Sequence, residues 1–164
     1  MIRAVGDPAA RFAEDGLRPL RAVRFAAQLG FRLDTATHAA IRPALPVAAR
    51  VSMERVAEEL SRLLAAEHVR AGLELLDETG LLSLLLPDLA ELSPELRAHA
   101  FSAVAACPRD LSVRLAALLH ALAAAAPPAS HRASYRASSS QWRRSQAPAR
   151  RNPARSRSHG VQAR

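Results

Sequence analysis

The sequence is poor in the residues and runs that mark secreted and membrane proteins. It has 164 residues with one cysteine, no lysine, and aromatic side chains at only 4% of positions. The single cysteine, Cys107, cannot form an intramolecular disulfide, and we expect a buried thiol in a reducing compartment. No apolar run reaches the roughly 18 residues that a membrane helix requires, and the N-terminus has no signal-like apolar stretch. These absences predict a soluble, cytoplasmic protein without a membrane partner.

Acidic residues are absent from the last part of the chain, and this changes the meaning of its net charge of +8. Residues 1–120 hold 14 arginines and 15 acidic residues, whereas residues 121–164 hold nine arginines and no acid. The basic charge therefore lies in the tail. From Pro127 onward the chain is rich in Ser, Pro, Ala and Arg, and too little apolar surface is present to offset the entropy of ordering. This composition predicts disorder over 125–164.

Alanine and leucine dominate the rest of the sequence, and both lose little conformational freedom in helices. Local signals divide it into helices: Asp7 and Pro8 form a start, Gly30 is a stop, and Ser52 is a further start. No run alternates between apolar and polar residues as a strand would. The predicted fold class is all-α, a helical bundle followed by the disordered basic tail. The expected segments are a short helical turn after Pro8, helices over 14–29, 34–41, 52–66, 67–80, 93–107 and 108–126, and a hydrophobic turn over 81–92.

The most charged of these predicted helices contains Asp15, Arg18, Arg21 and Arg24, spaced three residues apart. In a helix this spacing places the four side chains along one face. One interpretation is a solvated face with ion pairs that each contribute roughly 0.2–0.5 kcal/mol. The other is a nucleotide-reading surface, because a carboxylate beside a guanidinium offers acceptors and donors to the edge of a base, and further arginines suit phosphate. Periodicity alone leaves both open.

Three stretches narrow this choice. VGDPAARFAEDGLRPLRAVRFAAQLGF (5–31) is followed by VSMERVAEEL (51–60) and then by GLELLDETGLLSLLLPDL (72–89). In this order and spacing they resemble the bacterial tRNA nucleotidyltransferase family, which comprises the CCA-adding enzymes and their poly(A) polymerase relatives. The resemblance covers the neck and body region of that family, over about residues 2–120, and implies a helical fold for it.

The resemblance implies roles for two sets of residues. Asp15 and Arg18 would hydrogen-bond the base of incoming CTP or ATP and so select it. Contacts with phosphate or RNA are implied for the next two arginines of the same segment, Arg21 and Arg24. A structural role in the neck is implied for a second motif, Glu54, Arg55 and Glu59. The last two of these are four residues apart near a predicted helix start, where we expect them to form an ion pair.

The chain departs from the family at both ends. No Gly-rich phosphate-binding motif and no paired acids precede Arg3, so we expect this chain to lack the head domain that binds Mg²⁺ for phosphoryl transfer, and to hold no cofactor. Alone, it is not expected to add nucleotides. Toward the other end, Ala121 follows His120 where relatives with a metal-binding module have aspartate, so we expect no metal there. The abrupt change to the acid-free tail suggests a frameshift.

Together these features predict a fragment of a tRNA nucleotidyltransferase that contributes base selection and RNA binding in CCA addition or polyadenylation at RNA 3′ ends. The expected partners are tRNA or other RNA, and CTP or ATP when a head domain is present. The predicted organisation is neck helices over 1–65, a partial helical body over 66–124 and the tail over 125–164. Two alternatives stay open: a non-catalytic helical RNA-binding protein and a non-functional truncated gene product.

Overall fold

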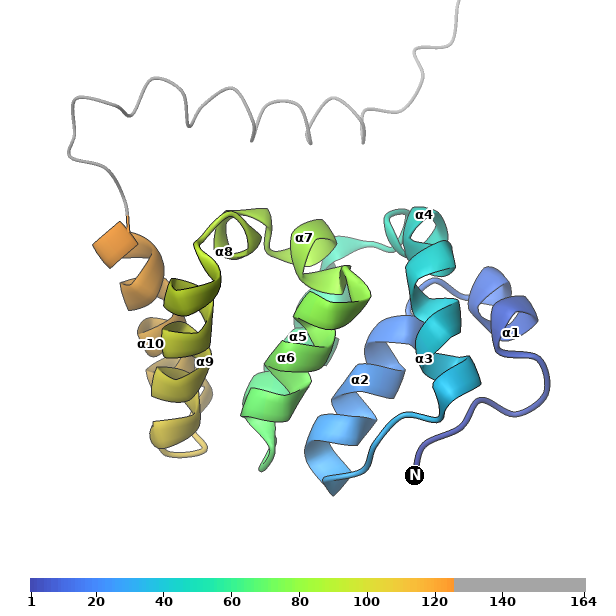
Figure 1. The fold of residues 1–164 in the computed structure, drawn as a ribbon, viewed down its shortest axis with the longest axis horizontal. Coiled ribbons are helices and arrows are strands. Elements are labelled where there is room, and N and C mark those ends of the chain that lie inside the picture. Colours follow the sequence, from blue (N-terminus) through green and yellow to red (C-terminus); the bar gives the residue numbers. More distant parts are fainter. Residues whose placement is uncertain (126–164) are drawn as a thin grey trace, which may run out of the picture. The chain divides into compact units, whose positions relative to one another are not determined.

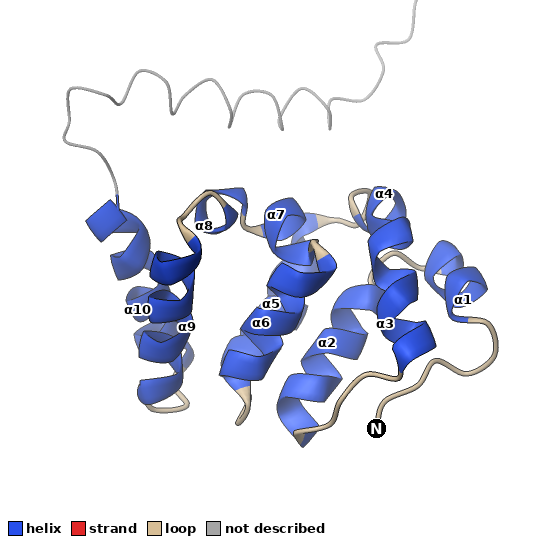
Figure 2. Ribbon diagram, in the orientation of Figure 1, coloured by secondary structure: helices blue, strands red, loops and turns tan. Residues whose placement is uncertain are grey.

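Helices account for nearly all the regular structure of residues 1–125, the part of the chain that this computed structural model describes (Figure 1). No strand occurs within this range (Figure 2), where an isolated β-bridge joins Ile2 to Leu33. The predicted all-α fold is confirmed. In chain order the elements are α1 (Pro8–Glu14), α2 (Arg18–Leu29), α3 (Thr35–Ile41), the 3₁₀ turn η1 (Arg42–Ala44), α4 (Leu45–Ala48), α5 (Met53–Leu64), α6 (Val69–Thr79), α7 (Leu81–Leu85), α8 (Pro87–Ala90), α9 (Pro94–Ala106) and α10 (Leu111–Ala125).

Local sequence signals set several of the helix ends. The Asp7 carboxylate accepts hydrogen bonds from the backbone N–H groups of Ala9 and Ala10, at 3.3 and 3.2 Å, and Pro8 opens α1. Gly30 ends α2 with a φ of 65°, a left-handed conformation that a residue without a Cβ adopts at little cost. The predicted start and stop are confirmed, because both depend on contacts between residues close in sequence.

The charged segment around Asp15 does not form one helix. α1 ends at Glu14, Asp15 has extended backbone angles (φ −146°, ψ 110°), and α2 begins at Arg18. Gly16 lies against α4, and a Cβ on it would be 2.5 Å from the carbonyl oxygen of Val47. This close approach fixes the turn between the two helices. The expectation of a continuous helix that carries Asp15 on one face with three arginines is therefore wrong.

The core lies where α2 packs against α5 and α6. α2 contributes Val23 and Ala27, α5 contributes Leu63, and α6 contributes Leu73, all of them buried. The approach of α2 to α6 is close, since a Cβ on Gly72 of α6 would lie 2.7 Å from the Cβ of Ala27. α6 also packs on α9, which lies beside α10 (Figure 1). The apolar sides of successive helices thus form a continuous core.

Three further predictions meet the structure in different ways. Cys107 is half-buried rather than fully buried, because α9 ends there and the chain turns into α10. The predicted boundary at residue 65 falls between α5 and α6, which contact each other, and it stays a prediction. The predicted disorder of the tail concerns residues that lie outside the described range. Within that range, no helix is both long and apolar enough to span a bilayer.

Candidate functional site

Asp15 lies in the turn between α1 and α2 and is held from two sides. Its Oδ1 accepts a hydrogen bond from the backbone N–H of Leu17 at 3.0 Å, and its Oδ2 accepts one from Arg55 of α5 at 3.3 Å. The Leu17 hydrogen bond and, to a smaller extent, the positive charge of Arg55 lower the pKa of the Asp15 carboxyl below its ordinary value. With 26% of its side chain exposed, Asp15 presents an ionised acceptor in a fixed orientation.

Arg18, at the first position of α2, is bound to α1 rather than to Asp15. Its Nη1 donates to the Glu14 carboxylate at 2.5 Å and to the backbone carbonyl of Arg11 at 2.9 Å. Arg18 and, next, Arg11 lower the pKa of Glu14 by hydrogen bonding to its carboxylate. The prediction that Asp15 and Arg18 lie one turn apart on a helix face is therefore wrong: Asp15 precedes α2, and the two side chains have different partners.

Arg21 and Arg24 converge on one carboxylate of α5. Arg21 Nε donates to Glu59 Oε1 at 3.0 Å, and Arg24 Nε donates to Glu59 Oε2 at 2.5 Å. Glu59 is 1% exposed and Arg24 is 7% exposed, with Arg24 also donating to Gln28. Arg21 keeps 45% of its side chain exposed. The phosphate or RNA contacts of both arginines stay predictions, and in this conformation only Arg21 presents an accessible guanidinium.

The second motif, on α5, reaches back to the first. Arg55 binds Asp15, and Glu59 binds the two arginines of α2 described above. The structure places no ion pair between Arg55 and Glu59, because each side chain has a partner across the α2–α5 contact; the expected i,i+4 pair is wrong. Glu54 is exposed in the first turn of α5, where hydrogen bonds from its own backbone N–H and from Ser52 lower its pKa. These contacts support the structural role predicted for the motif.

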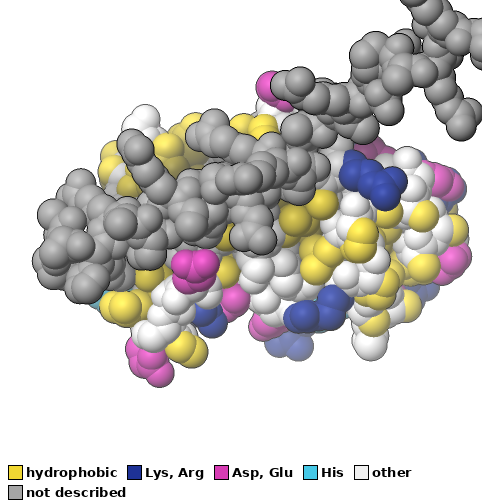
Figure 3. Space-filling model, turned by 90° about the horizontal axis from the view of Figure 1, so that it is seen from above, with side chains coloured by type: hydrophobic (Ala, Val, Ile, Leu, Met, Phe, Trp, Pro, Cys, Tyr) yellow, Lys and Arg dark blue, Asp and Glu magenta, His cyan; other side chains and the backbone are white. Residues whose placement is uncertain are grey.

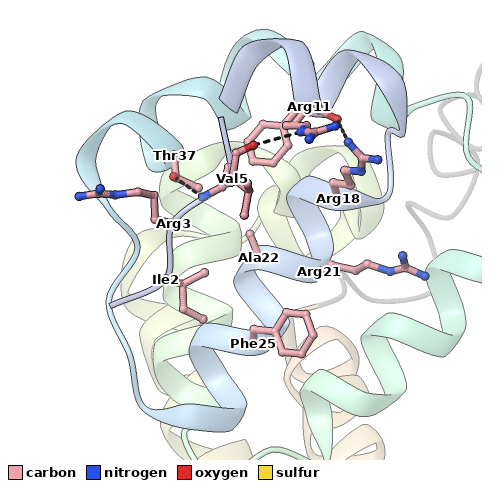
Figure 4. A pocket seen from close by; sticks show the side chains of 11 residues that line it. Ile2, Arg3, Val5, Arg11, Arg18, Arg21, Ala22, Phe25 and Thr37 are labelled. Atoms are coloured by element: carbon pink, nitrogen blue, oxygen red, sulfur yellow. Dashed lines mark hydrogen bonds between the residues drawn. The ribbon is translucent and has the colours of Figure 1, made fainter. Parts of the chain in front are cut away.

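A cavity of about 430 Å³ lies beside these residues, between the N-terminal segment, α1, α2 and α3 (Figure 4). Arg18 and Arg21 line it, as does Arg11 of α1, which the sequence analysis did not single out. Arg11 donates from Nε to the carbonyl oxygen of Val5 at 3.0 Å and from Nη1 to Glu14. The i,i+3 spacing of Arg11 and Glu14 could have indicated their ion pair. The contact of Arg11 with Val5 could not be predicted, because it depends on the path of the N-terminal segment.

Metal ligands do not cluster in the described residues. No group of three or more His, Cys, Asp and Glu side chains that could hold a metal ion occurs within residues 1–125. His120 is exposed on α10 and is followed by Ala121. The described residues thus offer no set of carboxylates that fits the Mg²⁺ site expected of a head domain, and we derive no step through a metal from them.

Comparison with known proteins gives one family match and several similar CCA-adding enzymes. Residues 30–93 match the family described as "Probable RNA and SrmB- binding site of polymerase A". The CCA-adding enzyme of Geobacillus thermodenitrificans is 50% identical over 97 residues, which are 59% of this chain and 24% of that protein. The CCA-adding enzyme of Lacticaseibacillus paracasei is 45% identical over 98 residues, 60% of this chain and 23% of that protein.

A solved structure is similar as well. The crystal structure of the Bacillus stearothermophilus CCA-adding enzyme in complex with CTP superposes with a TM-score of 0.62 and 37% sequence identity, over 74% of this chain and 30% of that chain. The helical fold is therefore similar to that of a nucleotide-adding enzyme, and residues 30–93 resemble a probable RNA-binding region of polymerase A. More specifically, residues 1–125 are similar to part of the CCA-adding enzymes, and the resemblance found in the sequence is confirmed. The chain spans about a quarter of the length of the curated relatives it matches.

Proposed function

We propose that this chain contributes base selection and RNA binding to nucleotidyl transfer at RNA 3′ ends, as part of a CCA-adding enzyme. One observation carries this proposal: an ionised acceptor, Asp15, and a guanidinium, Arg18, stand three residues apart where the chain turns into α2, and Arg18 lines a cavity there. The similarity to a CCA-adding enzyme solved in complex with CTP supports a nucleotide ligand. Substrates in this proposal are tRNA, CTP and ATP, in the cytoplasm.

The chemistry of these two side chains favours cytosine and adenine. Both bases present an amino group, which donates, next to a ring nitrogen, which accepts. A carboxylate can accept from the amino group while a guanidinium donates to the ring nitrogen. Uracil and guanine present the opposite order, a carbonyl next to a ring N–H. Their carbonyl oxygen would face the carboxylate, and their ring N–H would face the guanidinium, so neither hydrogen bond could form. Asp15 and Arg18 would therefore distinguish CTP and ATP from UTP and GTP.

Arg18 can take this role without leaving α1. Its hydrogen bonds within the described residues use only Nη1, and a guanidinium has five N–H donors. Nε and Nη2 are thus available to a base while Glu14 and the Arg11 carbonyl keep the side chain in place. The transfer itself would need the Mg²⁺-binding carboxylates of a head domain, which supply the metal chemistry in this proposal.

The test measures nucleotide preference with a head domain supplied in trans. Asp15→Ala and Arg18→Ala are expected to abolish the preference for CTP and ATP over UTP and GTP, because each removes one half of the acceptor–donor pair. Glu74→Ala, which removes a half-exposed side chain of α6 away from this turn, serves as the control. An unchanged preference in both variants would refute base selection by these residues.

The second candidate is a non-catalytic RNA-binding protein. Residues 121–164 favour it, because they hold nine arginines and no acidic residue and so would attract the phosphates of RNA. Deletion of residues 126–164 separates the two. If the helical part binds RNA as proposed, the shortened chain should still bind RNA, but more weakly. Complete loss of RNA binding would assign that binding to the tail alone.

A further inference from the structure

The helix α10 lacks the polar face that a surface helix ordinarily has. Apart from Ser112, Arg114 and His120, its 15 residues are all Leu, Ala or Val. Helices that are apolar on every side are usually buried. α10 lies with α9 at the end of the helical array opposite α1 (Figure 1), and only its inward side, which includes Arg114 and Leu118, is buried. Its outward side is therefore an exposed apolar surface.

Three leucines form a row on this outward side. Leu111, Leu115 and Leu119 follow one another at intervals of four residues, which places them along one side of the helix. Their exposed fractions are 38%, 42% and 52%. Beside this row, at the next positions around the helix, lie the exposed small side chains of Ser112 and Ala116. We call these five residues the α10 face: a ridge of leucines next to a row of small side chains.

The α10 face carries no charged side chain. The only arginine of α10, Arg114, is 3% exposed and donates to backbone carbonyls inside the fold. In the neighbouring helix α9, no Asp, Glu or Arg follows Arg97. In the turn between the two helices, Arg109 pairs with Glu67 at 2.8 Å, and Asp110 accepts from a backbone N–H at the start of α10. The exposed charges of α9 and α10 are thus confined to their ends.

Elsewhere the described helices expose ion pairs. On α5, for example, Glu58 accepts from Arg62 at 2.5 Å, and both side chains are more than half exposed. On the face seen in Figure 3, basic and acidic side chains of the described residues lie among hydrophobic ones. A contiguous exposed apolar surface without charge is typical of a site of protein contact. The α10 face has this character.

The residues that follow α10 in the chain are poor in apolar side chains. Across residues 126–164, the large apolar or aromatic residues are Tyr135, Trp142 and Val161, and nine arginines are present. This composition offers no row of apolar side chains to match the leucines. The α10 face itself is such a row, and a surface of this kind can be complementary to its own copy. A second copy of this chain therefore fits it.

We propose that the α10 face binds the α10 face of a second copy of this chain, with the two helices antiparallel. The leucine ridge of each copy then packs against the small side chains of the other, as ridges pack into grooves in helix pairs. Antiparallel helices align their dipoles favourably. They also keep the C-terminal ends of α10, each followed by nine arginines, at opposite ends of the contact. The contact is symmetric, so each residue acts twice.

The size of the surface predicts a weak dimer. α10 is about 22 Å long at 1.5 Å per residue, and a helix with its side chains is about 10 Å wide. One helix face thus covers roughly 200 Å², and the adjoining α9 can add about as much. Stable interfaces bury about 800 Å² per partner. We therefore expect monomer and dimer in equilibrium, with a dissociation constant of about 0.1 mM.

Sedimentation equilibrium of the full chain, freed of nucleic acid by nuclease, tests the proposal over a range of concentrations. The chain is expected to dimerise equally or more strongly at high salt, because salt screens repulsion between the basic tails but not apolar contacts. Association through the arginines and residual RNA would instead weaken with salt. A chain that stays monomeric at about 1 mM would overturn the proposal, as would dimerisation that high salt abolishes.

Leu119→Glu is expected to raise the dissociation constant at least about tenfold, because it places a charge in the apolar contact twice per dimer. Leu29→Glu is the matched control. Leu29 is 55% exposed, close to the 52% of Leu119, and it lies on α2, which packs on α5 and α6 (Figure 1). The control should dimerise as the parent chain does. Equal dissociation constants for the two variants would overturn the proposal.

A second variant covers the case in which Leu119→Glu loses its helical circular dichroism signal. Leu119→Ala removes apolar surface without adding a charge, and it is expected to raise the dissociation constant about tenfold. An unchanged value would contradict the proposed contact. The α10 face shares no residue with the proposed base-selecting site, so failure of the dimer would leave that proposal standing.

Discussion

Two buried arginines of this protein are stabilised in different ways. Arg24, where α2 meets α5, is paired with the buried carboxylate of Glu59. Arg114, where α10 meets the end of α5, is 3% exposed and donates to backbone carbonyls: those of Leu64 and Ala66 at 2.6 Å and that of Cys107 at 3.4 Å. The first region neutralises a buried charge with an opposite charge, and the second with peptide dipoles at helix ends.

The difference separates a contact that leaves a guanidinium exposed from one that buries it. Glu59 binds a second arginine, Arg21, whose side chain stays 45% exposed, so the α2–α5 contact orients a cation toward solvent. Arg114 presents no comparable surface, and its three carbonyl partners come from α5, from the residues that follow it and from the end of α9. A shared carboxylate thus leaves a charged group available to a ligand, whereas a set of carbonyls uses the guanidinium to join helices.

The largest effect on this comparison is expected from a change at Glu59, the buried partner of Arg24. Glu59→Ala is expected to destabilise the fold by about 3–5 kcal/mol, because it leaves the buried Arg24 without a counter-charge. Chemical denaturation of the variant checks this value. Glu58→Ala, which removes an exposed carboxylate paired with Arg62 on the same helix, is the control and should change stability by less than about 1 kcal/mol. A similar loss of stability in both variants would show that the buried ion pair contributes no more than an exposed one.

Arg114→Met tests the second region and should have a smaller effect. Methionine keeps much of the side-chain volume but leaves the carbonyls of Leu64 and Ala66 without their donor, at an expected cost of about 2–3 kcal/mol. The measurement is again denaturation, with Arg109→Met as the control because Arg109 is 59% exposed and pairs with Glu67 on the surface. A stability equal to that of the control would show that solvent or neighbouring groups replace the guanidinium.

Asp15→Asn should have the smallest effect and a characteristic pH dependence. The pKa of Asp15 is lowered in the folded protein, so its charge stabilises the fold above its ordinary pKa of 3.8, and this contribution is lost as the pH falls through the lower folded value. The variant should be less stable at neutral pH by about 1 kcal/mol or less and equal to the parent at strongly acidic pH. Denaturation at several pH values measures this. Asp88→Asn on α8 controls for the lost charge, and a constant difference at all pH values would contradict the assignment.

Much of the helical framework could be predicted because its signals are local. Asp34 caps α3 by accepting from the N–H of Thr37, and Ser93 caps α9 by accepting from that of Leu96, each within three residues. Other features depend on residues far apart. The N-terminal segment returns to residues 32–34, where Ile2 exchanges backbone hydrogen bonds of 2.8 Å with Arg32 and Asp34. No local pattern encodes that pairing, so the position of Arg11 beside the cavity was not predicted.

The sequence by itself determined several helix ends, such as those at Asp7 and Gly30, and the order of the motifs, since capping and motif spacing are properties of neighbouring residues. Only the tertiary structure decided what the charged residues of those motifs do. The close approach of Gly16 to α4 takes Asp15 off the helix. The packing of α5 buries Arg24 with Glu59 and leaves Arg21, one turn away, exposed. Their equal spacing in the sequence predicted the same role for both arginines. Their exposure differs because it depends on the neighbouring helix.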